Sequence, residues 1–124
     1  MSQDVVADGL NQIMNAKRVS KDSVSLKRHS KVLLGVLAIG KLRGYISEYR
    51  TNDNNLFIKF DKLNVCKAVK PRYVVRVKTI DKYVRRYLPA RDMGVLIIST
   101  SQGLMTHQTA QKKNIGGSVI AYFY

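Results

Sequence analysis

The chain has 124 residues and a formal net charge of +14, and this charge on so short a chain indicates a polyanionic partner. An apolar fraction of 45% excludes a disordered basic tail, and the longest apolar run, residues 32–39, is too short to cross a bilayer. The single cysteine, Cys66, excludes an internal disulfide, and no secretory signal opens the chain, so we expect a soluble, cytoplasmic protein.

The first elements of the chain are expected to be a helix and a strand. From Val6 onward, apolar residues recur at i, i+4, i+7 and i+8, and this spacing predicts a helix over residues 4–16. A basic connection leads to residues 23–27, where polar and apolar residues alternate with the period of a strand.

A second helix and a hairpin are expected to follow. Ser30 is a favourable N-cap for this helix, and Gly44 is a favourable residue to end it. Apolar residues cover much of the helix surface, so we expect the helix to be mostly buried against a sheet. Residues 44–49 and 55–60 have strand character, and the polar residues between them favour a hairpin. The expected order of the first half is therefore helix, strand, helix, strand, strand.

The most basic part of the chain is residues 62–91, with ten Lys or Arg residues against one acid. An ordinary solvated face is one interpretation, but like charges at this density repel one another unless a polyanion neutralises them. We therefore expect nucleic acid to contact this stretch, with Lys70 and Arg72 as candidate phosphate ligands. The pattern also predicts a strand over residues 73–77 and a short helix over residues 80–87.

The last quarter of the chain contains a hydroxyl-rich loop between a buried strand and a helix. A β-branched run at residues 95–98 predicts the strand, Thr106 is a favourable N-cap for the helix, and residues 118–124 have strand character again. The loop consists of Ser99, Thr100, Ser101, Gln102 and Gly103. Its hydroxyl and N–H donors suit phosphate oxygens and ribose 2′-OH groups, although such hydroxyls can also simply cap a turn.

Catalysis and metal binding are not expected. Ser99, Ser101 and His107 are close in sequence, but no carboxylate nearby would orient the histidine. The two histidines and the cysteine lie too far apart for a zinc site, so we expect no catalytic residue, metal, cofactor or small-molecule substrate. His107 would either contact RNA or stabilise the start of its helix.

Together these patterns predict an α+β fold of two small α/β domains packed together. Residues 1–64 would form an N-terminal α-β-α-β-β domain, and residues 65–124 a C-terminal RNA-binding domain, mainly antiparallel β with a short helix. Because most aromatic residues lie in strand patterns, recognition of structured RNA by shape, phosphate and 2′-OH contacts is expected rather than base stacking.

Several segments of the chain resemble one protein family. They are STSQGLMTH at residues 99–107, GGSVIAYFY at 116–124, ADGLNQIMNA at 7–16, SKVL at 30–33, GYI at 44–46 and LPAR at 88–91. In sequence and spacing they are similar to the universal eighth protein of the small ribosomal subunit, in its archaeal and eukaryotic branch. The resemblance extends over nearly the whole chain.

The resemblance implies a structural, non-enzymatic protein of the small ribosomal subunit. Such a protein binds a helix in the central domain of small-subunit rRNA, supports assembly and translation, and contacts neighbouring ribosomal proteins. The hydroxyl-rich loop would approach the minor groove of that RNA helix. The implied RNA contacts are Ser99, Thr100, Ser101, Gln102, Gly103, Gly117, Asn15, Ser30 and Lys31.

Two positions depart from the bacterial members of that family. His107 replaces a usual acid, and Gln102 replaces a common lysine. For Gly117, a helix stop and a close approach of backbone to RNA are both compatible with the sequence. The alternative function is a non-ribosomal RNA- or DNA-binding architectural protein, although the chain has no helix-turn-helix pattern, zinc site or basic zipper.

Overall fold

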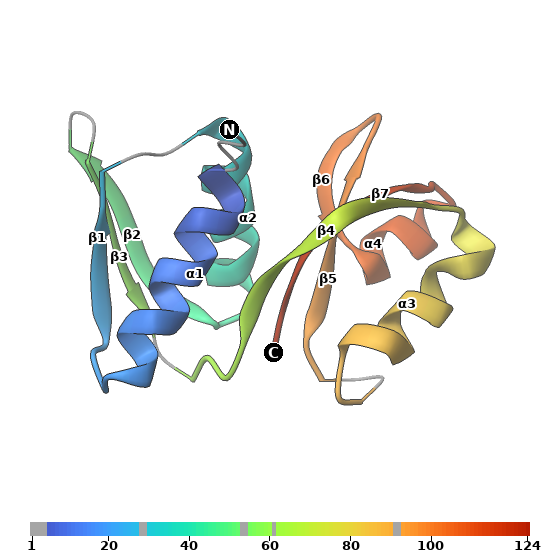
Figure 1. Cartoon of the computed structure of the whole chain (residues 1–124). Coiled ribbons are helices and arrows are strands. Elements are labelled where there is room, and N and C mark those ends of the chain that lie inside the picture. Colours follow the sequence, from blue (N-terminus) through green and yellow to red (C-terminus); the bar gives the residue numbers. More distant parts are fainter. Residues whose placement is uncertain (1–4, 28–29, 53–54, 61, 91–92) are drawn as a thin grey trace. The chain divides into compact units, whose positions relative to one another are not determined.

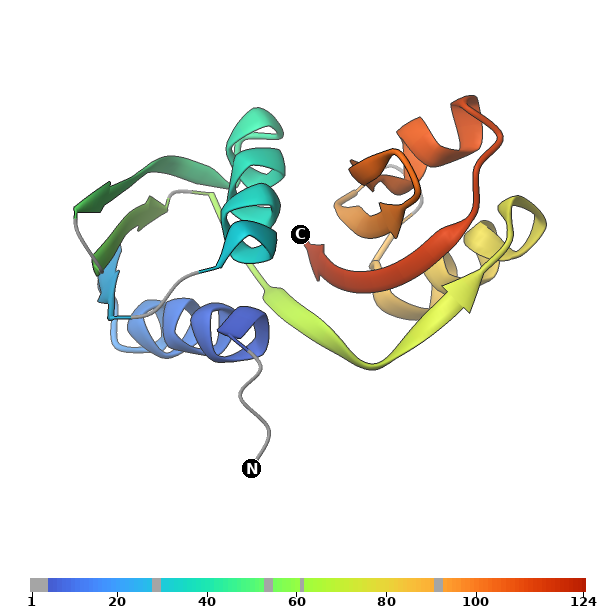
Figure 2. The ribbon, with the colours of Figure 1, turned by 90° about the horizontal axis from the view of Figure 1, so that it is seen from above.

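The computed structural model describes residues 5–27, 30–52, 55–60, 62–90 and 93–124, and of residues 52 and 70–73 it describes the backbone alone. It divides into two compact units, Met1–Lys67 and Ala68–Tyr124 (Figures 1 and 2). Helices and strands occur in both units, so the predicted α+β class is confirmed. None of the described helices is long and apolar enough to cross a membrane.

The first unit is a three-stranded sheet with two helices on one face. Its elements are α1 (Val5–Arg18), β1 (Ser23–Leu26), α2 (Lys31–Leu42), β2 (Ile46–Asn52) and β3 (Asn55–Phe60). The strand order is β1-β3-β2, and both pairings are antiparallel. The views show α1 and α2 on the same side of this sheet (Figures 1 and 2). The predicted order helix, strand, helix, strand, strand is confirmed.

The second helix packs on one side only. Ser30 caps it as predicted, because its Oγ accepts a hydrogen bond from the N–H of Leu33 at 3.2 Å. Gly44, with φ +89°, follows the last turn in the left-handed conformation that glycine favours. Leu33 and Leu37 are fully buried, but Leu42 is 83% exposed. The expectation of a mostly buried helix is therefore wrong at its C-terminal end.

The second unit is a four-stranded sheet with strand order β4-β7-β5-β6. Its elements are β4 (Cys66–Val75), a short 3-10 helix (Val77–Thr79), α3 (Ile80–Tyr87), β5 (Val95–Thr100), β6 (Gly103–Thr106), α4 (His107–Lys112) and β7 (Gly117–Phe123). The first two residues of β4 belong to the first unit. In its core, Leu96 and Val119 of the sheet pack with Ile80 and Val84 of α3 and with Ala110 of α4. The helix predicted over residues 80–87 is confirmed.

Two strands differ from the predictions for this unit. β4 is longer than the predicted residues 73–77, because it lies at the sheet edge, where Pro71 and adjacent basic residues do not interrupt a strand. β6 was not predicted at all. Only Leu104 and Met105 of its four residues are apolar, so the segment lacked a readable alternation.

Candidate nucleic-acid interface

The hydroxyl-rich segment is the tip of a β-hairpin. β5 and β6 pair antiparallel, with Thr100 opposite Gly103, so that Ser101 and Gln102 alone form the turn. The hairpin projects beyond the other elements of its unit (Figure 1). The expectation that this segment is a loop leading directly from a strand into a helix is therefore wrong, because the four residues of β6 lie between the turn and α4.

The shape of the tip is maintained by Thr100 and Gly103. The hydroxyl of Thr100 accepts a hydrogen bond from the N–H of Gln102 at 3.1 Å and donates one to the carbonyl of Gly103 at 2.9 Å. Gly103 has φ +107°, a conformation that other residues adopt only under strain. Among the described residues other than its two chain neighbours, no atom lies within 4 Å of where its Cβ would be, so the backbone of Gly103 is open to a ligand.

The remaining donors of the tip are available to a partner. Ser101 and Gln102 are exposed, and Ser99 is half-buried. Within the part of the chain that the structure describes, the hydroxyls of Ser99 and Ser101 make no hydrogen bond. The tip thus presents the hydroxyl of Ser99 at the end of β5 and the hydroxyl of Ser101 and the side-chain amide of Gln102 on the turn, and these groups can donate to phosphate or ribose oxygens.

Close packing between two strands explains why position 117 is a glycine. It begins β7, and a Cβ at this position would overlap the carbonyl oxygen of Ser99 and approach a methyl group of Ile98 to 2.9 Å. The next residue, Ser118, pairs with Ser99 across the sheet. Glycine therefore lets β7 pack against β5 directly below the hairpin tip, and the structure brings Gly117 next to Ser99.

His107 belongs to the core and not to the surface. It is 3% exposed, and its Nδ1 accepts a hydrogen bond from the backbone N–H of Leu96 at 3.1 Å. Thr106 is the N-cap of α4, as predicted, and its Oγ1 accepts from the N–H of Thr109 at 3.2 Å. Of the two roles considered for His107, the structure supports the structural one, because a buried imidazole is not accessible to RNA.

The other candidate residues of the first unit lie on its two helices. Ser30 is half-buried at the start of α2, where its hydroxyl caps the helix, and Lys31 follows as an exposed residue. Asn15 is exposed on α1, and its Oδ1 accepts from Nη1 of Arg18 at 3.4 Å. The structure thus brings Ser30 and Lys31 together and places Asn15 on a different helix.

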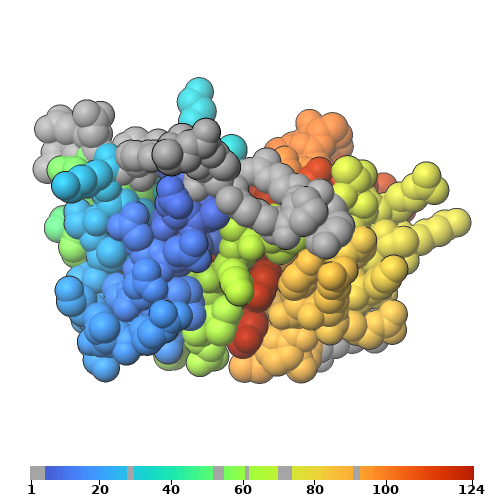
Figure 3. Space-filling model, in the orientation of Figure 1, coloured from blue at the N-terminus to red at the C-terminus, as the bar shows by residue number. Residues whose placement is uncertain are grey.

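Lys70 and Arg72 lie in β4, but their side chains are outside the described residues. The described basic side chains at the surface of this unit include Lys82, Arg85 and Arg86, which are exposed on α3. The space-filling view shows atoms of this part of the chain at the molecular surface (Figure 3). Their spacing of i, i+3 and i+4 could have indicated this common face from the sequence. The carboxylate of Asp81 at the start of α3 accepts a hydrogen bond from Nε2 of Gln111 at 2.9 Å.

The described residues offer no metal site, since no three His, Cys, Asp or Glu side chains among them could hold an ion. Cys66 is a buried thiol, and its Sγ donates to the carbonyl of Leu10 at 3.6 Å. Burial raises the pKa of this thiol from 9.0 to about 12. Cys66 is therefore neutral at physiological pH and acts as part of the core.

Residues 4–124 match the family model for ribosomal protein S8. The chain is also similar to two curated proteins of Schizosaccharomyces pombe (strain 972 / ATCC 24843), the small ribosomal subunit proteins uS8A and uS8B. Each is 36% identical over 127 residues, and each alignment covers 98% of this chain and 98% of the relative. The similarity therefore includes both units and every candidate residue named above.

Proposed function

The chain belongs to the ribosomal protein S8 family as a non-enzymatic, structural constituent of the small ribosomal subunit, and we propose that it binds a helix in the central domain of small-subunit rRNA there. The observation that supports this proposal is the hairpin tip. It projects from its unit and carries the hydroxyls of Ser99 and Ser101 and the side-chain amide of Gln102, which make no hydrogen bond within the described chain.

The tip fits the minor groove of an RNA duplex. This groove is wide and shallow in A-form RNA and displays ribose 2′-OH groups along its edges. The hydroxyls of Ser99 and Ser101 and the amide of Gln102 would meet these groups, and Gly103 lets the backbone approach because it has no side chain. The two hydrogen bonds of Thr100 order the turn before binding, which reduces the entropic cost of association.

Basic residues would supply the contacts that do not depend on RNA sequence. Lys82, Arg85 and Arg86 are exposed on α3, and a contact of each with a phosphate would release counterions. Ser30 and Lys31 at the start of α2 would add contacts from the first unit, where the positive end of the helix dipole favours a phosphate. Neighbouring proteins of the subunit would occupy other faces of the chain.

A titration of the purified protein over a series of salt concentrations tests this proposal. The ligands are a central-domain fragment of small-subunit rRNA, an unrelated RNA duplex and a DNA duplex of equal length. We expect binding to the rRNA fragment to persist at salt concentrations that abolish binding to the other two. Equal and steeply salt-dependent binding to all three would contradict specific recognition, and a preference for DNA would favour an architectural DNA-binding protein.

A further inference from the structure

The face of the first unit's sheet that points away from α1 and α2 carries an aromatic side chain at its centre. In β3, Leu56, Ile58 and Phe60 are buried, while Phe57 between them is half-exposed and Lys59 is exposed. This alternation places Phe57 and Lys59 on the outward face of the central strand.

Two rows of paired residues cross this outward face. Phe57 and Lys59 of the central strand each lie between one residue of β1 and one residue of β2. The face therefore combines one aromatic ring with two cations, two hydroxyls and one carboxylate, and its excess of positive charge favours an anionic ligand. The first row is Ser25, Phe57 and Arg50, and the second row is Ser23, Lys59 and Glu48.

The ring of Phe57 has a cation on one side and a hollow on the other. The guanidinium of Arg50 lies 5.2 Å from the ring centroid. Arg50 is on β2, whereas the hollow is lined by Ser23 and Ser25 of β1, on the opposite side of the central strand. The hollow is shallow and open to solvent, with a volume of about 700 Å³.

The lining of the hollow suits the parts of a nucleotide. Phe57 and Val19 contribute apolar surface, and Val19 is 64% exposed. Gln12 and Asn15 of α1 contribute amides, which can both donate to and accept from a base edge. Lys21 adds a cation for a phosphate. An aromatic surface beside a positive charge is the combination by which proteins bind single-stranded nucleic acid.

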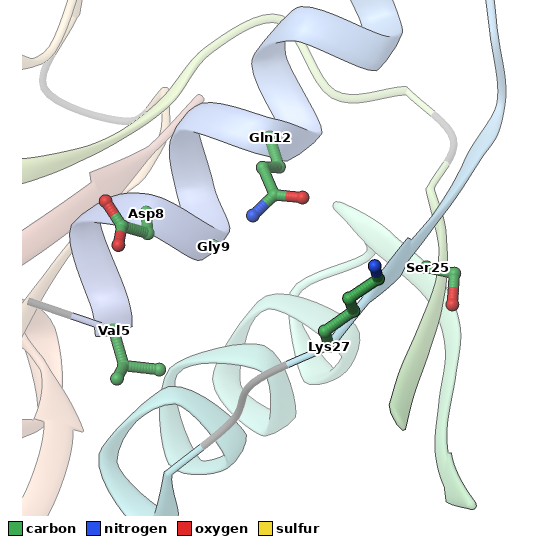
Figure 4. A pocket seen from close by; sticks show the side chains of 6 residues that line it. All are labelled: Val5, Asp8, Gly9, Gln12, Ser25 and Lys27. Carbon is green, nitrogen blue, oxygen red and sulfur yellow. The ribbon is translucent and has the colours of Figure 1, made fainter. Parts of the chain in front are cut away.

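A second, smaller hollow adjoins the first along the same line between α1 and β1, since both are lined by Gln12 and Ser25. Figure 4 shows that Val5, Asp8 and Gln12 line this smaller hollow from α1, and that Lys27 lines it from the position that follows β1. Because Asp8 makes this part less favourable for a phosphate, the larger hollow beside Phe57 is the better site for a negatively charged ligand.

We propose that an unpaired ribonucleotide binds in this hollow, with its base stacked on Phe57 and its phosphate beside Lys21. A base within a duplex cannot enter the hollow, so the ligand is a single-stranded segment or a bulged nucleotide of RNA. This contact is additional to the hairpin tip and differs from it in kind, because it uses stacking. The choice of RNA as the ligand rests on the proposed function above.

The test uses the full chain and a short single-stranded oligoribonucleotide with 2-aminopurine at its centre, whose fluorescence decreases when the base stacks. We expect the unmodified protein to quench this fluorescence on binding. Phe57→Leu, which keeps an apolar side chain but removes the ring, should weaken binding about fivefold or more and remove the quenching. Phe57→Tyr should retain both, because it restores an aromatic face.

A parallel titration with the rRNA central-domain fragment separates this inference from the proposed function. Ser101→Ala should weaken binding of that fragment and leave binding of the single-stranded ligand unchanged. Unaltered quenching by folded Phe57→Leu would overturn the stacking site, whatever the fragment does. The stacking site would also be overturned if an acidic peptide displaced the oligonucleotide and the binding of that peptide depended on Phe57. The ligand of this hollow would then be a protein segment and not RNA. Failure of the unmodified protein to bind the fragment more tightly than an unrelated duplex, with Phe57-dependent stacking intact, would instead contradict the proposed function.

Discussion

The backbone N–H of Leu96 donates a hydrogen bond to Nδ1 of His107 at 3.1 Å, and both residues are buried. The pairing of β5 with β6 ends at Ile97 and Thr106, and His107 is the first residue of α4. Beyond Thr106 the chain continues as α4 and no longer pairs with β5. The imidazole of His107 therefore accepts the hydrogen bond from the N–H of Leu96 in β5 at this point. Such a bond requires Nδ1 to be unprotonated, so the ring carries its proton on Nε2.

We expect His107→Leu to lower the free energy of unfolding by about 1–3 kcal/mol, because the N–H of Leu96 would stay buried without an acceptor. Urea denaturation measures this loss. His107→Asn is the matched control, since its Oδ1 can take the place of Nδ1 and should preserve more of the stability. RNA affinity should not change in the folded control variant, and a specific loss of rRNA binding there would contradict a purely structural role.

The hairpin and His107 show which features of the site the sequence could predict and which it could not. The residues of the tip were predicted as a group from their hydroxyls, and Thr106 was predicted as an N-cap from its type. The hairpin was missed because β6 is short and half of its residues are polar or glycine. The sequence did not decide whether His107 is buried, because a histidine at a helix start gives the same pattern whether its side chain faces solvent or a sheet.

The outward face around Phe57 shows a second limit of sequence patterns. The alternation in β3 was sufficient to predict the strand, but not which residues of β1 and β2 lie beside Phe57. That arrangement depends on register, since a shift by one residue moves every side chain to the other face. Only the register of the strands shows that Phe57 has the cation Arg50 beside it on β2 and Ser25, which lines the hollow, beside it on β1.

Ser101→Ala tests the hairpin tip directly. We expect it to weaken binding to the cognate rRNA helix by about 1 kcal/mol, or roughly fivefold, because the variant cannot make one of the hydrogen bonds to RNA. Binding to an arbitrary RNA duplex should weaken less, and stability should not change because the Ser101 hydroxyl has no partner in the described chain. Thr100→Ser is a suitable control, since it keeps the hydroxyl that orders the turn. Equal losses of affinity for both RNAs would indicate that Ser101 has no part in specific recognition.

Gly117→Ala tests whether packing alone requires glycine at the start of β7. The new Cβ would overlap the carbonyl of Ser99, so β5 and β7 would have to separate at this point. We expect a loss of about 1–3 kcal/mol in the free energy of unfolding, as in other overpacked sites. Thermal unfolding provides the measurement. An unchanged melting temperature together with weaker RNA binding would show instead that the glycine serves a contact with RNA.

The exposed cations of α3 are expected to act through phosphates. The double variant Lys82→Gln, Arg85→Gln should weaken binding to all RNAs to a similar degree, and it should reduce the salt slope by somewhat under one for each phosphate that is no longer neutralised. The glutamines retain helix propensity, so the fold should not change. Salt-dependent titrations of the variant and the unmodified protein provide the comparison, and identical slopes would place both side chains away from RNA.

Cys66 should make the stability of the chain depend on alkaline pH. Burial raises the pKa of its thiol from 9.0 to about 12, so below pH 9.0 both the folded and the unfolded chain keep the proton. Between these values the unfolded chain loses the proton and the folded chain keeps it, and the free energy of unfolding must therefore decrease as pH rises. The measurement is a difference between the unmodified chain and Cys66→Ala in urea denaturation at increasing pH, because the difference isolates the contribution of this thiol. We expect the unmodified chain to lose stability more steeply, and parallel curves would show that Cys66 is open to solvent.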